Sequence, residues 1–228
     1  MEYIVNEIGS IGFIRELAAA QRANGDPGIV VFENYVRWKG PPAQVMRLAA
    51  DDAADPPISP QFAILVYAQN PLFNTYCTLG ASLRPVPGSA AYSGDPRGVR
   101  FEYLIHARPE DEQQITDLLP LVAAHPYVHN IGTGPGAVLS IGEPVVRGSA
   151  MEYLYLTYPY VDEPHMQTRA YGQIDQGDLL IQMLWLIPLY RSEVAHLEQI
   201  GPEAFEELLF ARHQERYDAY ELDRLPLV

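Results

Sequence analysis

The amino-acid sequence predicts a single α+β domain over residues 1–228. Three observations favour this class. Short apolar segments with strand-like patterns recur along the chain between segments with helical periodicity. Apolar residues make up 48% of the 228 residues, enough for a sizeable core. No internal repeat and no linker-like stretch divides the chain, so helices and strands are expected to share one core.

The N-terminal part is predicted to form one helix and then one strand. Ser10 is a favourable N-cap for a helix that runs to about Ala23, and Gly25 can end this helix. Its inner face would carry Phe13, Ile14, Leu17 and Ala18. The next segment, GIVVFENYVRW at residues 28–38, is predicted to be a strand because it is rich in β-branched and aromatic residues.

Loops and strands alternate in the middle of the chain. Residues 49–60 are expected to form an acidic, proline-rich loop. FAILVYA at residues 62–68 and TYCTLGAS at residues 75–82 are predicted to be strands. The connection over residues 84–99 is rich in turn residues, and connections of this length are often functional or mobile.

The segment RFEYLIHA at residues 100–107 alternates as a strand does. One face would carry Phe101, Tyr103 and Ile105, and the other Glu102, Leu104 and His106. A helix is expected to begin at Pro109, because proline fits a first turn and the acidic residues 110–112 suit the positive end of the helix dipole. Its inner stripe would be Ile115, Leu118, Leu119 and Val122. Pro120 should kink or split this helix.

The last part of the chain is predicted to contain three strands and two helices. The strands cover about residues 136–142, 150–157 and 178–187, and the last is apolar on both faces, as a central strand should be. One helix starts at Ser192, carries Val194, Leu197 and Ile200, and ends at Gly201. Pro202 opens the next helix, whose core stripe would be Ala204, Phe205, Leu208 and Leu209. The polar tail after His213 is expected to fray.

Charge and cysteine content narrow the classes of partner and compartment. The chain has 15 Lys+Arg against 29 Asp+Glu, a net charge of -14. Such a surface disfavours nucleic acid and anionic membranes but suits a basic partner, although acidic charge often serves solubility alone. Cys77 is the only cysteine, so a reducing compartment is expected. No secretory signal and no apolar stretch of membrane-spanning length is visible, which predicts a cytoplasmic protein.

The glycine-rich stretch NIGTGPGAVLSIGEP at residues 130–144 partly matches a dinucleotide-binding fingerprint through Gly132, Gly134 and Ala137. That fingerprint needs a preceding strand and a following helix, whereas here a helix precedes and a strand follows. The chain's only lysine is Lys39, so a phosphate-binding Gly-Lys-Ser/Thr loop is also missing. We therefore predict a turn that leads into a strand, and no cofactor.

The sequence gives only weak evidence for metal-binding or catalytic residues. His125 and His129 have the spacing of a helical metal pair, but Pro126 lies between them and surface or capping roles are preferred. Glu102 and His106 share a strand face but lie about 13 Å apart along the backbone, so a solvated face is preferred to a catalytic pair. Ser140 lacks the glycine-flanked elbow motif, and Cys77 is expected to be buried and inert. The residues alone therefore predict no metal site and no enzyme.

Five blocks in the distal half of the chain resemble the suppressor-of-fused family in order and spacing, across about residues 60–212. They are NTYCTLGAS, VRFEYLIHAR followed by a helix, IGTGPGAVLSIGEPV, MEYLYLTYP, and LLIQMLWLIPLYRSEVAHLEQIGPEAFEELL. The last block is the most specific, with an apolar strand that ends in Ile187-Pro188-Leu189-Tyr190 and a second helix that begins at Gly201-Pro202.

The resemblance implies a mixed, largely antiparallel sheet packed by helices, and a domain that binds protein without catalysis. In animal relatives this domain and a second one grip a short peptide by strand addition. The present chain is too short for that second domain, so the peptide cleft would be incomplete. Stand-alone bacterial relatives resemble immunity proteins that neutralise a cognate polymorphic toxin, which is the function we predict here. A peptide-binding regulator and an uncharacterised hydrolase that uses His106 or Cys77 are the alternatives.

Two residues are candidate partner contacts on the strength of this resemblance. Tyr76 aligns with a tyrosine that touches the bound peptide in animal relatives, and Thr78 should share its strand face. Packing at the edge of the core is the alternative role for Tyr76. The expected partner is a protein, with a basic toxin domain best suited to the charge, while the oligomeric state is left open.

Overall fold

A computed structural model describes residues 3–6, 11–48, 58–159, 172–212 and 224–228. Through this described part runs a nine-stranded sheet in the order β1-β2-β3-β4-β5-β9-β7-β6, with β8 paired to β9. The strands are β1 Tyr3–Asn6, β2 Gln44–Leu48, β3 Ala63–Asn70, β4 Phe73–Leu79, β5 Arg100–Ala107, β6 Val138–Ser140, β7 Tyr153–Thr157, β8 Gln173–Gln176 and β9 Leu179–Leu189. Among these described pairs only β5 and β9 run parallel. The predicted α+β fold with a mixed, largely antiparallel sheet is confirmed.

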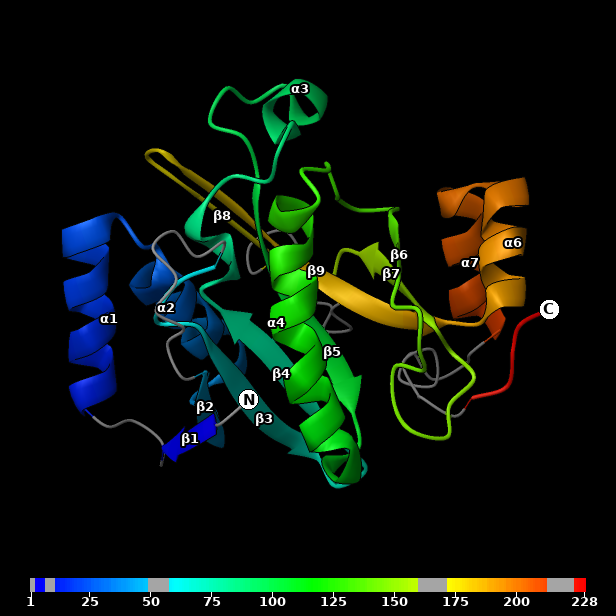
Figure 1. Cartoon of the computed structure of the whole chain (residues 1–228), viewed down its shortest axis with the longest axis horizontal. Helices are drawn as coiled ribbons and strands as arrows, with labels where there is room; N and C mark the ends of the chain where they lie inside the picture. The colour runs from blue at the N-terminus through cyan, green and yellow to red at the C-terminus, as the bar shows by residue number, and fades with distance from the viewer. Residues whose placement is uncertain (1–2, 7–10, 49–57, 160–171, 213–223) are drawn as a thin grey trace.

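Helices cover both faces of this sheet (Figure 1). Their bounds are α1 Ile11–Asn24, α2 Gly28–Lys39, α3 Ser89–Ser93, α4 Glu112–Val128, α6 Arg191–Ile200 and α7 Pro202–Arg212, with short 3-10 turns at η1 Ala81–Leu83 and η2 Pro109–Asp111. The helix α4 packs on one face and buries Ile115, Leu119 and Val122 there. The helices α1, α2, α6 and α7 pack on the opposite face. Each buried leucine, isoleucine or phenylalanine in these two cores contributes about 1.5–3 kcal/mol to stability.

Residues 28–38 form the helix α2 and not the strand that their composition predicts. The buried side chains Val31, Asn34 and Tyr35 recur at helical spacing, so one face of this segment packs on the sheet. The N-terminus is set by Asp26, whose carboxylate accepts a hydrogen bond from the Gly28 N–H at 2.8 Å. Packing of this amphipathic face overrides the β-propensity of the segment.

The strand β5 follows the predicted alternation, but neither of its faces is solvated. Phe101, Tyr103 and Ile105 join the core beneath α4. Glu102 is 0% exposed and His106 is 5% exposed, so the predicted solvated face is wrong. The reason is that β5 lies between β4 and β9 in the middle of a sheet that is covered by helices on both sides.

Other differences from the predictions are local. The helix α4 continues through Pro120 and Pro126 without a break, so Pro120 does not split it. Ile14 and Ile200 are each 37% exposed, and Ala204 lies at the surface, so these three are not core residues. The expected cap Ser10, residues 49–57 of the predicted acidic loop, and residues 214–223 of the predicted fraying tail lie outside the described residues. The end of that tail, residues 224–228, is held by a buried ion pair between Arg224 and Glu193, so the prediction of fraying is wrong there. The predicted single domain stays a prediction.

Candidate functional site

Tyr76 and Thr78, the two predicted partner contacts, lie on β4 in the middle of the sheet, and both are 0% exposed. Tyr76 belongs to the core beneath α4, and its hydroxyl oxygen accepts a hydrogen bond from the Asn74 amide at 3.3 Å. Burial raises the pKa of Tyr76 to about 12. A partner would reach Tyr76 only if α4 moved, and Thr78 is equally buried, so the contact role stays a prediction.

Replacing Tyr76 by phenylalanine separates a structural role from a contact role. The substitution removes only a hydroxyl that makes one long hydrogen bond, so we expect the free energy of unfolding to change by less than about 1 kcal/mol. Thermal unfolding and a binding titration against the affinity-captured partner measure the two effects separately. A folded Y76F variant that binds its partner much more weakly would support direct contact.

Thr78 holds a buried carboxylate at the end of β4. Its hydroxyl donates to Glu102 Oε2 at 2.6 Å and accepts a hydrogen bond from the Tyr103 N–H at 2.8 Å. The N–H groups of residues 80–82 donate to the same carboxylate at 3.0, 3.3 and 3.0 Å, and the Ser82 hydroxyl donates at 2.6 Å. Burial raises the pKa of Glu102 to about 7, against the opposing effect of these donors. The carboxylate thus fixes the turn that follows β4.

Cys77 and His106, the residues of the predicted hydrolase alternative, are both buried. Burial raises the pKa of the Cys77 thiol to about 12, although Lys39 opposes the shift. Burial also lowers the pKa of His106, whose ring packs 4.5 Å from the Trp185 ring and whose Nδ1 lies 2.9 Å from the Thr75 hydroxyl. A neutral thiol that no substrate reaches is a poor nucleophile, so this geometry disfavours covalent catalysis.

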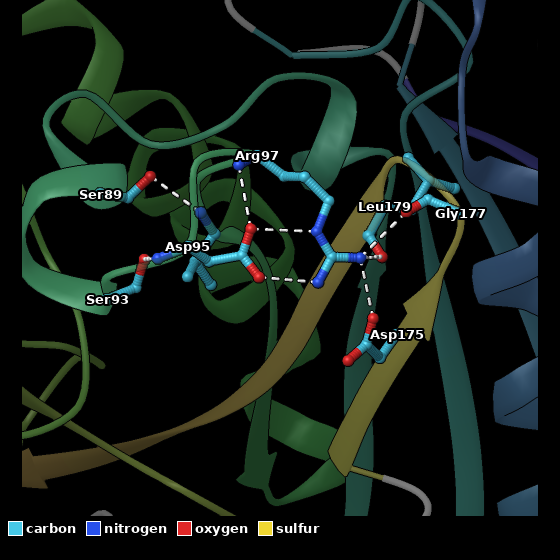
Figure 2. A network of polar contacts seen from close by, with 8 residues as sticks. Ser89, Ser93, Asp95, Arg97, Asp175, Gly177 and Leu179 are labelled. Carbon is cyan, nitrogen blue, oxygen red and sulfur yellow. Dashed lines mark hydrogen bonds and ion pairs between the residues drawn. The ribbon is translucent and has the colours of Figure 1, made fainter.

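Arg97 ties the long connection between β4 and β5 to the turn between β8 and β9, as Figure 2 shows. Its guanidinium donates to both oxygens of Asp95 at 3.0 and 2.7 Å, and on the other side to Asp175 at 2.8 Å and to the Gly177 carbonyl at 3.0 Å. The hydrogen bonds that Arg97 donates to Asp95 lower the pKa of Asp95 to about 2. The Ser89 hydroxyl accepts a hydrogen bond from the Val99 N–H at 2.9 Å, so the connection is anchored at a second point.

A groove of about 580 Å³ lies between α4 and the segment that follows β6. In Figure 1, α4 crosses the front of the sheet, and β6 with its following segment lies beside it. The floor of the groove is apolar and is formed by Leu118, Val122, Leu139 and Val145. Acidic Asp117 and Glu143 and basic Arg147 line it as well. Because β6 is the last strand in the sheet order, the groove adjoins an edge of the sheet.

Two features make this groove suited to recognition. Gln114 and His125, two residues that line the groove, each carry one buried side-chain atom without a hydrogen-bond partner, Oε1 and Nδ1 respectively. Beside them, Leu121 is 60% exposed and Val128 is 67% exposed on the same helix. Exposed apolar side chains that are rimmed by polar residues are typical of protein-binding surfaces. The sequence carried one signal for this surface, since α4 has apolar residues on more than one face.

His125 and His129 lie at the C-terminal end of α4, with ring centroids 4.6 Å apart. Burial lowers the pKa of His125, and His129 adds to the effect. Across the described ranges, no group of three or more His, Cys, Asp or Glu side chains is placed to hold a metal ion. The glycine stretch forms a turn before β6, with no helix after it, and the Tyr92 hydroxyl donates to the Thr133 carbonyl at 2.9 Å. The predicted turn is confirmed.

The family model of the suppressor of fused protein (SUFU) matches residues 59–224 of this chain. The chain belongs to the suppressor of fused family. This family comprises protein-interaction domains and is not catalytic. No curated protein sequence gives a significant match. The resemblance predicted from the five sequence blocks is therefore confirmed, and the matched range extends to Arg224.

Solved structures of suppressor of fused proteins share the fold. A SUFU homologue from Neisseria gonorrhoeae has a TM-score of 0.61 at 17% identity, over 90% of this chain and 98% of its own. Drosophila Suppressor of Fused has a TM-score of 0.62 at 14% identity. The match covers 89% of this chain and 51% of the Drosophila chain. A chain of the Sufu–Fu complex has a TM-score of 0.60 at 12% identity, and the match covers 89% of this chain and 93% of that chain. At these identities the likeness concerns the fold alone. No helix in the described part of this SUFU-family chain is long and apolar enough to span a membrane.

Proposed function

We propose that this SUFU-family chain is a cytoplasmic, single-domain immunity protein that binds and neutralises a cognate toxin without catalysis. The observation that carries this proposal is the groove between α4 and β6, which combines an apolar floor, exposed Leu121 and the acidic side chains of Asp117 and Glu143. Burial of Cys77 and His106 supports a binding role over a hydrolytic one.

A basic partner segment is the occupant that the charges favour. The chain carries a net charge of -14, and two acidic side chains against one basic side chain line the groove. Gln114 and His125 are separated by about 16 Å along the helix axis, at about 1.5 Å per residue. An extended chain of about five residues covers this length. We propose that a basic, extended segment of the toxin lies along α4.

Leu121→Asp is expected to weaken partner binding at least about tenfold, because it places a charge in the apolar part of the contact. The partner is first isolated by affinity capture with the wild-type chain, and its Kd is then measured by titration. Ile11→Asp is the matched control, since Ile11 is 68% exposed and lies on α1, across the sheet. Equal loss of affinity in both variants, or loss in the control alone, would contradict the groove as the site.

Association with a basic partner should slow as salt concentration rises, because the attraction between net charges is screened beyond about 10 Å at ordinary ionic strength. Stopped-flow measurement of the association rate over a salt series tests this. An association rate that does not change with salt would contradict a basic partner.

Toxin rescue distinguishes immunity from the alternative of a peptide-binding regulator. Co-expression of this chain should protect cells from the captured partner if that partner is a toxin. A partner that binds at the groove but is harmless when expressed alone would favour the regulatory role.

A further inference from the structure

A short segment with no helix or strand of its own, residues 224–228, is held against the start of α6 (Figure 1). Its anchor is Arg224, which is 5% exposed and forms an ion pair with Glu193, itself 0% exposed. The guanidinium donates to both oxygens of Glu193, at 2.8 Å to Oε2, and to the Pro188 carbonyl at 2.9 Å. We call the receiving surface, formed by Pro188, Tyr190, Ser192 and Glu193, the α6 seat.

The main chain of this segment is bound by side chains of the α6 seat. The Leu227 N–H donates to Glu193 Oε1 at 3.0 Å, and the Ser192 hydroxyl donates to the Val228 carbonyl at 2.9 Å. The Tyr190 hydroxyl donates to the Arg224 carbonyl. The side chains of the segment differ in burial. Arg224 and Leu227 face the protein, whereas Leu225 is 83% exposed. One charged anchor, one apolar anchor and captured main-chain groups are the elements of peptide recognition.

We propose that the α6 seat is a peptide-binding site, and that residues 224–228 are its resident occupant, bound within the same chain. Its ligand class is a segment with arginine followed three positions later by a branched apolar residue. The planar fork of arginine fits the two Glu193 oxygens, and lysine lacks this fork. This site is separate from the groove between α4 and β6 and does not depend on the function proposed for it.

Several features indicate that the occupant can exchange with another segment. Among the described strand pairings, none includes residues 224–228, so no ladder joins this segment to the sheet. The seat keeps part of its structure without the occupant, because Glu193 Oε2 also accepts the Tyr190 N–H at 2.9 Å. Once the occupant has left, we expect water to reach Glu193 and to compensate its charge.

The experiment uses the full chain with a protease site inserted within residues 213–223. After folding and cleavage, we expect the chain to stay folded by circular dichroism and to bind a dye-labelled peptide, Arg-Leu-Pro-Leu-Val, in fluorescence anisotropy. Uncleaved chain should bind this peptide at least about tenfold more weakly, because its seat is occupied. Peptides with Arg→Lys at the first position or Leu→Ala at the fourth should each bind about tenfold more weakly than the parent.

Three results would overturn the proposal. Unfolding on cleavage would make the segment an inseparable part of the fold. A cleaved, folded chain that does not bind the peptide would show that the seat has no affinity in trans. Equal binding by cleaved and uncleaved chain, or by the parent and Arg→Lys peptides, would place the binding elsewhere.

Discussion

Replacing Glu102 by alanine is expected to lower the free energy of unfolding by at least about 4 kcal/mol. The carboxylate accepts hydrogen bonds from three main-chain N–H groups of residues 80–82 and from the hydroxyls of Thr78 and Ser82. A buried donor that loses its acceptor costs about 1–3 kcal/mol, and the hydroxyls can turn to other acceptors while the N–H groups cannot. Chemical denaturation of the wild type and E102A measures the difference.

Glu102→Gln is the matched variant, and comparing it with the wild type tests how the contribution of Glu102 to stability depends on pH. Burial raises the pKa of Glu102 to about 7, from 4.5 in a solvated chain. Between these values the folded state keeps a proton that the unfolded state has released, so this group's contribution to stability is complete below about pH 4.5 and is lost as the pH rises through about 7. A shift of this size corresponds to about 3 kcal/mol. Glutamine does not titrate, so its stability relative to the wild type should improve over this window.

A different pH dependence is expected if the hydrogen-bond donors around Glu102 lower its pKa more than burial raises it. The wild type would then keep Glu102 ionised at pH 5, and the stability difference between wild type and E102Q would stay constant from pH 5 to pH 7. An infrared band of a protonated carboxyl group, present in the wild type at pH 5 and absent in E102Q, checks the protonation state directly. A loss below about 1 kcal/mol in E102A would mean that water replaces the carboxylate.

The Glu102 site shows which part of the structure the sequence could predict. The alternation over residues 100–107 correctly predicts which side chains share a face. Alternation does not say what covers a face, and here α1, α2, α6 and α7 cover the face that carries polar residues. Those helices come from both ends of the chain, so the burial of Glu102 depends on contacts between segments far apart in sequence.

The elements that were predicted wrongly or missed have two causes. Residues 28–38 have strand propensity, but α2 forms because its helical face packs on the sheet. The strands β1, β2 and β8 have four or five residues each, too few for a clear period. Long, strongly patterned segments such as β9 and α4 were predicted correctly, because their own sequence fixes the period.

The groove between α4 and β6 could be predicted only in part. Leu121 and Val128 lie off the core stripe of α4, which indicates a second apolar face on this helix. The opposite wall comes from residues 139–148, whose placement follows from β6 pairing with β7 at the edge of the sheet. A pattern within one helix cannot reveal a wall that belongs to another segment.

Arg224→Ala is expected to cost about 3–5 kcal/mol, because it leaves Glu193 buried without its cation. Arg224→Lys keeps the charge but not the two-point contact, so its cost should be smaller than that of alanine. Denaturant unfolding of both variants measures these costs.

Complete detachment of residues 224–228 should cost at least as much as Arg224→Ala, because a variant that has lost its anchor can release the segment and needs no greater cost than that. In R224A the Leu227 N–H can still donate to the Glu193 carboxylate, at 3.0 Å in the wild type, so part of the contact is kept. In a chain cleaved within residues 213–223 and freed of the fragment, water solvates the same carboxylate and compensates its charge. If R224A instead proves as stable as the wild type, water or another cation already reaches Glu193, and the buried ion pair does not stabilise the end of the chain.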